Sequence, residues 1–162
     1  MKNLRFGFGQ FKPELNKQWW DFEGSKVKCV LECIGDSKYY PNPLKIACDP
    51  RSLSVSEILE DKTTKCVGCI YTETSFATEV LFDIILHPSI ISQSQEIQDE
   101  YYISIYNKLE NLLREIGYSD MKTWLLESDE RLCKMYNDLG YDYLDGGENA
   151  LDEPSILVSK PL

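Results

Sequence analysis

Residues 129–144 read DERLCKMYNDLGYDYL, and this stretch decides how the second half of the chain folds. Four apolar residues recur in it at helical spacing: Leu132, Met135, Tyr136 and Leu139. Gly140 follows them, and glycine commonly ends a helix because it tolerates a left-handed backbone. The stretch therefore predicts a short amphipathic helix over 129–139, followed by a strand.

The segments before and after this helix have the patterning of a mixed α/β domain. Five segments have the alternation or apolar content of strands: 65–71, 79–86, 121–126, 141–144 and 156–158. The first two are expected to form a hairpin around a turn at 72–77. Apolar residues at helical spacing predict a long helix over 95–116, ended by Gly117. An acidic loop is expected at 145–154.

The first 64 residues have weaker patterns. A short strand or lid is expected within 1–24, and the alternation in 26–34 predicts a half-buried strand. Ser54 followed by Glu57 is a capping-box pattern, which predicts a brief helix over 55–61. We expect 1–64 to be the N-terminal part of the same domain and 65–162 to be its core.

From Lys65 onward the element order resembles that of the GCN5-related N-acetyltransferase (GNAT) superfamily. Val67-Gly68 is similar to the family's recurrent Val-Gly-Phe, and LFDIILHPS at 81–89 is similar to its Leu-x-Val-x-Pro strand end. The segment 129–144 resembles the family's Leu-Tyr-x-Lys-x-Gly-Phe helix end, with Asp129 in place of an asparagine. The resemblance implies a mixed, mostly antiparallel sheet flanked by helices.

The sequence departs from the family where the long helix begins. The family has glycines there, because bare backbone N–H groups must approach a diphosphate closely. The matching residues here contain no glycine: Ile91, Ser92, Gln93, Ser94, Gln95 and Glu96. Ser94 and Glu96 would crowd the diphosphate, and the Glu96 carboxylate would repel it by about 1 kcal/mol.

The resemblance implies that acetyl-coenzyme A is the co-substrate. It also implies that the following residues bind it: Ile84, Ile85, Leu86, Ser92, Gln93, Ser94 and Asp129. It also implies that Tyr136 protonates the departing thiolate and that Glu79 accepts a proton from the amine. The residues alone leave a second interpretation open, in which Tyr136 is a core side chain and Glu79 a solvated strand end. His87, the single histidine, is expected to be structural.

No metal site is expected. Cys66 and Cys69 form a CxxC pattern that could join Cys29 and Cys33 around zinc. Both pairs lie in strand-like runs, and residues three apart on a regular strand face opposite ways. The cysteines are therefore expected to be free thiols of a reducing compartment.

Charge limits the classes of partner. The chain has 17 Lys plus Arg against 27 Asp plus Glu, a formal net charge of −10. The negative electrostatic potential of such a protein repels nucleic acid and anionic membranes. It favours an amine or a basic protein as substrate or partner. No apolar run of membrane-spanning or signal-peptide length is evident, so a cytosolic or nuclear location is expected.

Two hypotheses about function follow from these features. The first is a divergent N-acetyltransferase that transfers an acetyl group from acetyl-coenzyme A to an amine. The second is a catalytically inactive protein of the same fold that binds and regulates a protein partner. Ornithine decarboxylase antizyme, which shares this topology, offers the analogy for the second hypothesis.

Overall fold

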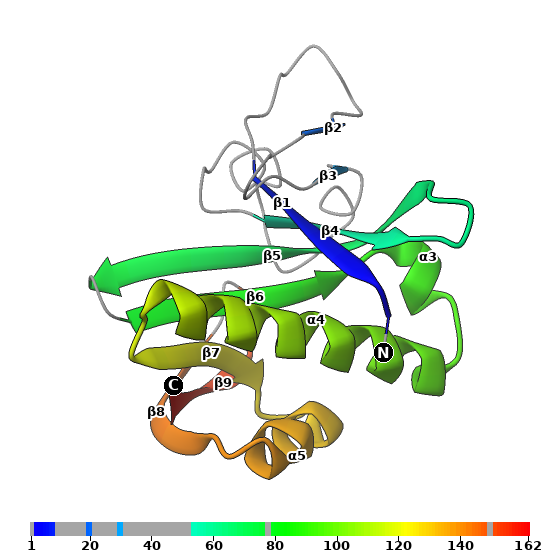
Figure 1. Cartoon of the computed structure of the whole chain (residues 1–162). Helices are drawn as coiled ribbons and strands as arrows, with labels where there is room; N and C mark the ends of the chain where they lie inside the picture. Colours follow the sequence, from blue (N-terminus) through cyan, green and yellow to red (C-terminus); the bar gives the residue numbers. More distant parts are fainter. Residues whose placement is uncertain (1, 9–18, 21–28, 31–52, 77–78, 149–150) are drawn as a thin grey trace. The chain divides into compact units, whose positions relative to one another are not determined.

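The computed structural model describes residues 2–8, 19–20, 29–30, 53–76, 79–148 and 151–162 (Figure 1). The chain divides into two compact units. The first unit comprises Met1–Thr72 and Ile84–Leu109, and the second comprises Glu73–Asp83 and Glu110–Leu162. Strands β5 and β6 and helix α4 each contribute residues to both units. No helix in the described part of the chain is long and apolar enough to cross a membrane.

Seven strands form one sheet, in the order β1-β4-β5-β6-β7-β9-β8. Their bounds are β1 Leu4–Phe8, β4 Leu53–Ile58, β5 Thr64–Phe76, β6 Glu79–Leu86, β7 Asp120–Leu126, β8 Asp142–Glu148 and β9 Pro154–Pro161. The β6–β7 pair is parallel, whereas β1–β4, β4–β5, β7–β9 and β8–β9 are antiparallel. Strands β2 (Trp19–Trp20) and β3 (Cys29–Val30) pair separately. The predicted mixed, mostly antiparallel sheet is confirmed.

In the described part of the chain, three helices accompany the sheet: α3 Pro88–Ile91, α4 Gln95–Ile116 and α5 Glu130–Asp138. Helix α4 is the crossover that two adjacent parallel strands require, because a hairpin cannot connect them. It has the predicted bounds, and Gly117 follows it with a φ of +104°, as a helix-ending glycine does. Helix α5 lies within the predicted 129–139.

The first unit buries one face of α4 together with residues from its strands. Its buried apolar residues include Leu4, Phe6, Val55, Val67, Ile70, Ile90, Ile105, Tyr106 and Leu109. The helical residues among them recur at spacings of three and four, as the sequence pattern predicts. The apolar face of α4 is thus what attaches the helix to this unit.

The second unit buries one face of β6 and β7 against aromatic side chains. Val80 and Phe82 on β6 alternate with half-buried neighbours, and so do Met121, Thr123 and Leu125 on β7. Tyr136 on α5 packs against Phe82, with ring centroids 6.3 Å apart. The opposite face of the same strands is more exposed, and it carries Glu79 and Lys122.

The structure corrects several local predictions. The segment predicted as a helix over 55–61 is instead strand β4, because it pairs with β1 on one side and with β5 on the other. Tertiary pairing has overridden a local capping pattern there. Strand β5 continues through most of the predicted turn at 72–77, and β8 continues to Glu148 inside the predicted loop. The short helix α3 was not predicted.

Some predictions concern residues outside the described part of the chain. Of the predicted strand at 26–34, only Cys29–Val30 is described, as β3. The predicted strand or lid within 1–24 is described only as β1 and β2. The division of the domain at residue 64 stays a prediction.

Candidate functional site

In the first unit, the end of β6 packs closely against a bulge in β5. The register of β4 and β5 shifts between Val55 and Ser56, so Val67 is an extra residue in β5. The carbonyl of Val67 accepts a hydrogen bond from the His87 N–H at 2.8 Å. A Cβ added to Gly68 would lie 2.5 Å from the carbonyl oxygen of Ile85, so only glycine fits there.

This packing fixes the direction of the backbone groups along β6. The Ile85 carbonyl and the His87 N–H both point to β5. Because backbone groups alternate along a strand, those of Ile84 and Leu86 point to the other edge of β6. The parallel ladder with β7 covers only Glu79–Leu81. Ile84 and Leu86 therefore lie beyond the end of that ladder.

Helix α3 begins directly after β6, with His87 as its N-cap. Nδ1 of His87 accepts the Ser89 N–H at 3.1 Å and lies 2.8 Å from the Ser89 hydroxyl oxygen. The single histidine thus has the structural role that was predicted. The N–H groups of Ile91, Ser92 and Gln93 donate to carbonyls of this turn. Their backbone donors are engaged within the turn.

The start of α4 offers some but not all of what a diphosphate needs. Residues 91–96 are exposed, and the first N–H groups of a helix have no partner within it. Ser94 caps one of them, because its hydroxyl accepts the Ile97 N–H at 3.4 Å. Glu96 adds a negative charge to the first turn. Backbone donors are present, but a glycine cradle is not.

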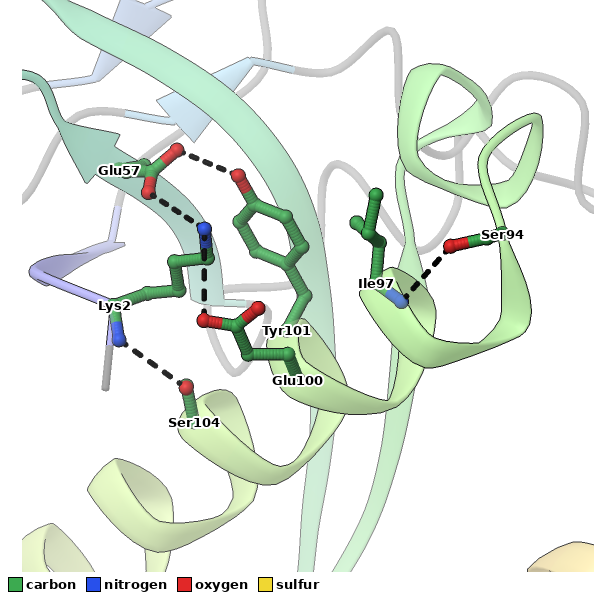
Figure 2. A network of polar contacts seen from close by, with 7 residues as sticks. All are labelled: Lys2, Glu57, Ser94, Ile97, Glu100, Tyr101 and Ser104. Atoms are coloured by element: carbon green, nitrogen blue, oxygen red, sulfur yellow. Dashed lines mark hydrogen bonds and ion pairs between the residues drawn. The ribbon is translucent and has the colours of Figure 1, made fainter.

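A lysine from the N-terminal segment reaches the first turns of α4 (Figure 2). Nζ of Lys2 lies 3.7 Å from Glu100, 3.9 Å from Glu57 and 4.7 Å from the centre of the Tyr101 ring. The Tyr101 hydroxyl donates to Glu57 at 2.7 Å, and burial followed by Glu57 raises the pKa of Tyr101. Lys2 is therefore already engaged by two carboxylates.

No basic side chain from this region of the sequence adds to the anion-binding capacity of the α4 start. The segment from Cys66 to Asn107 contains no Lys or Arg. A diphosphate at Ser94 would meet backbone donors but no neighbouring counter-charge from that segment. The described residues thus fit the neutral arm of a coenzyme A thioester better than they fit its anionic end.

In the second unit, Glu79 lies at the start of β6 and pairs with a lysine that the sequence analysis did not single out. Oε2 of Glu79 lies 2.8 Å from Nζ of Lys122. Glu79 is opposite Asp120 in the parallel ladder, so Lys122 lies two residues further on the same face. A base at Glu79 would have to exchange this lysine for an incoming amine.

Tyr136 lies on the opposite face of β6 from Glu79. Its side chain is fully buried. It contacts Phe82 on one side and the edge of Tyr141 on the other, with the second pair of centroids 4.9 Å apart. The Tyr141 hydroxyl is 3.6 Å from the Met121 sulfur. The two predicted catalytic residues thus reach the same strand from its two sides.

Asp129, another of the predicted site residues, has a structural role in helix α5. Asp129 is the N-cap of α5, and its Oδ1 accepts the Leu132 N–H at 3.1 Å. Burial, followed by the charges of Asp129 and Glu127, raises the pKa of the Cys133 thiol. Among the described residues, no three His, Cys, Asp or Glu side chains are placed to hold a metal ion.

Cys66 and Cys69 lie on the same face of β5, so the prediction that they face opposite ways is wrong. Cys66 pairs with Ser56 and Cys69 pairs with Ser54, so the bulge at Val67 returns both cysteines to one face. Both side chains are buried, and the Cys66 thiol lies 3.8 Å from the Gly68 carbonyl oxygen. Neither cysteine forms a disulfide bond.

The exposed face of the second unit carries further polar residues that the sequence analysis missed. Directly opposite residues of antiparallel strands share a face, and one row across β7, β9 and β8 contains Trp124, Leu157 and Asp145. The neighbouring row contains Lys122, Ser159 and Asp142. The alternation in MKTWLL already separates Lys122 and Trp124 from Met121 and Thr123, and that signal could have found them.

Comparison with solved structures identifies the architecture. The ribosomal-protein-S18-alanine N-acetyltransferase of Escherichia coli is 13% identical and matches with a TM-score of 0.61, over 90% of this chain and 93% of that one. The fold is that of the GNAT N-acetyltransferases. The spermidine/spermine N-acetyltransferase SpeG of Vibrio cholerae, at 9% identity, matches with a TM-score of 0.55 over 70% of this chain and 68% of that one.

A third GNAT structure agrees. The ribosomal-protein-alanine N-acetyltransferase of Brucella melitensis is 10% identical and has a TM-score of 0.51, over 68% of this chain and 69% of that one. No model of a known protein family matches the sequence, and no curated protein does. The likeness to the GNAT fold therefore lies in the arrangement of the backbone.

Proposed function

We propose that this protein is a divergent N-acetyltransferase that transfers an acetyl group from acetyl-coenzyme A to an amine. The observation that carries the proposal is the β6–β7 pair, in which the parallel ladder ends at Leu81 while β6 continues to Leu86. The backbone groups of Ile84 and Leu86 point to that edge. The amides of a pantetheine arm can hydrogen-bond to such an edge in the way that an added strand does.

The residues of the proposed donor site follow from this placement. Ile84 and Leu86 bind the amides of the arm, Ile85 holds β6 against β5, and Ser92, Gln93 and Ser94 lie where the anionic end binds in the fold. Asp129 acts indirectly, by capping the helix that carries Tyr136. Coenzyme A supplies the activated acetyl thioester when it is bound.

The chain's own proton-transfer groups are Glu79 and Tyr136. Glu79 accepts the proton of the acceptor amine once Lys122 has moved aside, and the Tyr136 phenol donates a proton on the other side of β6. Tyr136 is better placed for this step than Tyr141, because its ring contacts Phe82, on the strand that also carries Glu79.

Calorimetry and thermal shift with acetyl-coenzyme A test the donor site. A ligand at about 100 times its dissociation constant should stabilise the fold by about 2.7 kcal/mol. Acetylpantetheine, which lacks the diphosphate, is the matched comparison. The segment from Cys66 to Asn107, which contains the α4 start, has no Lys or Arg to pair with the diphosphate. The two donors should therefore differ in affinity by no more than about tenfold. Absence of any shift with either donor at millimolar concentration would refute the proposal.

One observation favours a second candidate, a catalytically inactive GNAT fold that binds a basic protein. Both predicted catalytic side chains are already satisfied inside the second unit, Glu79 by Lys122 and Tyr136 by its aromatic neighbours. Charge reversal at Glu148, Asp152 and Glu153 should then slow association with such a partner, and the effect should diminish at high salt. Acetyl transfer without a stoichiometric partner would exclude this candidate.

A further inference from the structure

An amine of the protein itself lies beside the proposed base. Nζ of Lys122 is 2.8 Å from Oε2 of Glu79. A base takes a proton from an amine that lies within hydrogen-bond distance, and this separation meets that condition. Both side chains are partly exposed, 23% for Lys122 and 32% for Glu79. A reagent in solution therefore has access to the pair.

The register of the sheet places this amine at the end of the β6–β7 ladder. Lys122 is opposite Leu81, in the last residue pair that the two parallel strands share. Glu79 is two residues before Leu81 and so lies on the same face of the sheet. Strand β6 continues beyond this pair to Leu86. The Lys122 side chain thus starts where the two strands stop pairing and reaches back to Glu79.

The proposed function brings the acetyl end of the donor to the same place. Its arm lies along Ile84 and Leu86, and its anionic end lies toward Ser94. The chain runs from β6 through α3 to the start of α4, so the anionic end lies beyond the Leu86 end of β6. The thioester is at the other end of the arm, and it therefore points along β6 to Leu81, opposite Lys122.

We propose that the protein acetylates its own Lys122 and that this modification frees Glu79 for an external amine. The inference rests on the proposed function for its donor, its base and its acid. It adds a first acceptor, which is a residue of the chain itself.

The step balances in atoms and protons. Glu79 takes one proton from the Lys122 ammonium and passes it to water. The neutral Nζ then forms the amide N–C bond as the C–S bond of the donor breaks. The surplus proton on the nitrogen goes to Glu79, and the sulfur leaves as a thiol with the proton of Tyr136. Proton exchange with water restores Glu79 and Tyr136.

Acetylation removes the charge that holds Glu79. The amide formed at Lys122 is neutral, so it cannot keep the ion pair with the Glu79 carboxylate. An external amine then meets Glu79 without having to displace an ammonium group. Lys122 thus acts on later acceptors through Glu79.

Two other lysines of the second unit distinguish this reaction from unassisted chemical acetylation. Lys160 is 22% exposed, and its Nζ lies 2.6 Å from the Glu110 carboxylate. It is opposite Met121 and so lies on the other face of the sheet from Lys122. Lys134 is 77% exposed. If exposure alone decided the rate, Lys134 would react first.

Mass spectrometry of the unaltered protein with acetyl-coenzyme A tests the inference. Peptides that contain each lysine are followed over time. Lys122 should gain an acetyl group at least about tenfold faster than Lys134 or Lys160, because its base and donor are held in place. The fraction modified at a given time should not depend on protein concentration, because the transfer occurs within one chain. Faster modification of Lys134 than of Lys122 would overturn the inference.

Two variants test whether base and acceptor act within the same chain. Glu79→Gln keeps the Lys122 amine but removes the base, and it should slow acetylation of Lys122 by at least about tenfold. Lys122→Arg keeps a positive charge beside Glu79 but removes the acceptor amine. A mixture of the two variants should react no faster at Lys122 than Glu79→Gln alone. Rapid acetylation in the mixture would overturn the inference. Melting of each variant confirms that it is folded.

Transfer to added butylamine separates the inference from the proposed function. The unaltered protein should show a lag that ends as Lys122 becomes modified, whereas Lys122→Gln, which is neutral at this position, should show none. Acetylated butylamine with Lys122 unmodified would overturn the inference and leave the proposed function standing. Acetylation of neither amine would overturn both.

Discussion

Individual side chains decide where the two halves of the proposed reaction are placed. Glu79 and Tyr136 belong to opposite faces of β6, because residue 79 and the Tyr136 contact at Phe82 differ by an odd number of positions. In the absence of substrate, Glu79 is held in an ion pair with Lys122. An acceptor amine therefore has to displace Lys122 before it can reach Glu79.

Replacing Tyr136 with Phe tests its proposed role as acid. Loss of the phenol proton should lower kcat by about 100-fold and leave KM for the donor nearly unchanged, because only proton donation is removed. Tyr141→Phe is the control, since it removes the same group from a neighbouring buried ring and should leave kcat within about twofold. Equal rates for the two variants would make Tyr136 a packing residue.

Gly68 is the residue at which backbone packing leaves no room for a side chain. Gly68→Ala should destabilise the protein by about 3 kcal/mol, because its Cβ would lie 2.5 Å from a backbone carbonyl that cannot rotate away. Gly146→Ala should cost less than about 1 kcal/mol, since its nearest atom is the mobile end of Tyr143 at 3.1 Å. Urea unfolding measures both, and similar losses would contradict the close approach of β5 and β6.

At the scale of elements, side-chain hydrogen bonds help to hold β4, α3 and α4 in place. His87 starts α3, and Tyr101 connects α4 to Glu57 on β4 (Figure 2). These are polar contacts at the ends and edges of elements whose apolar faces are already buried. They give α3 its first turn and join α4 to β4.

Substitution of His87 tests the cap of α3. His87→Ala should cost about 1 kcal/mol, because the Ser89 N–H loses its acceptor. His87→Asn supplies a side-chain oxygen in a similar place and should recover most of that loss. If the two variants melt at the same temperature, the Nδ1 contact does not stabilise the turn.

The Tyr101–Glu57 bond predicts a response to alkaline pH. The pKa of Tyr101 is raised in the folded protein, so above about pH 10 the unfolded chain loses this proton while the folded chain keeps it. Stability should therefore fall as pH rises beyond that value. Tyr101→Phe should reduce the fall between pH 9 and 11. Identical pH profiles for the variant and the unaltered protein would contradict this linkage.

At the scale of the whole molecule, the net charge of −10 should govern the response to salt. Like charges repel in the compact state, so Tm should rise as NaCl increases from about 10 to 150 mM and screens this repulsion. A variant with Glu148, Asp152 and Glu153 changed to Gln should show a smaller rise. A fall in Tm with salt would mean that ion pairs such as Glu79–Lys122 outweigh the repulsion.

The sequence by itself determined the elements whose pattern is local. Helix α4 and strand β6 have their predicted bounds because their apolar periodicity runs without interruption from one end to the other. The helix at 129–139 was predictable for the same reason, and its Leu-Gly-Tyr end carried the resemblance to the GNAT fold. Charge and composition likewise need no tertiary structure.

Only the tertiary structure decided which residues share a face. The bulges at Val67 and Leu144 each place two residues three apart on one side, Cys66 with Cys69 and Asp142 with Asp145. A bulge is fixed by pairing with a neighbouring strand, so the alternation within its own strand does not decide where the extra residue lies. For the same reason, β4 became a strand and Lys122 became the partner of Glu79, because strands from elsewhere in the chain supply the contacts.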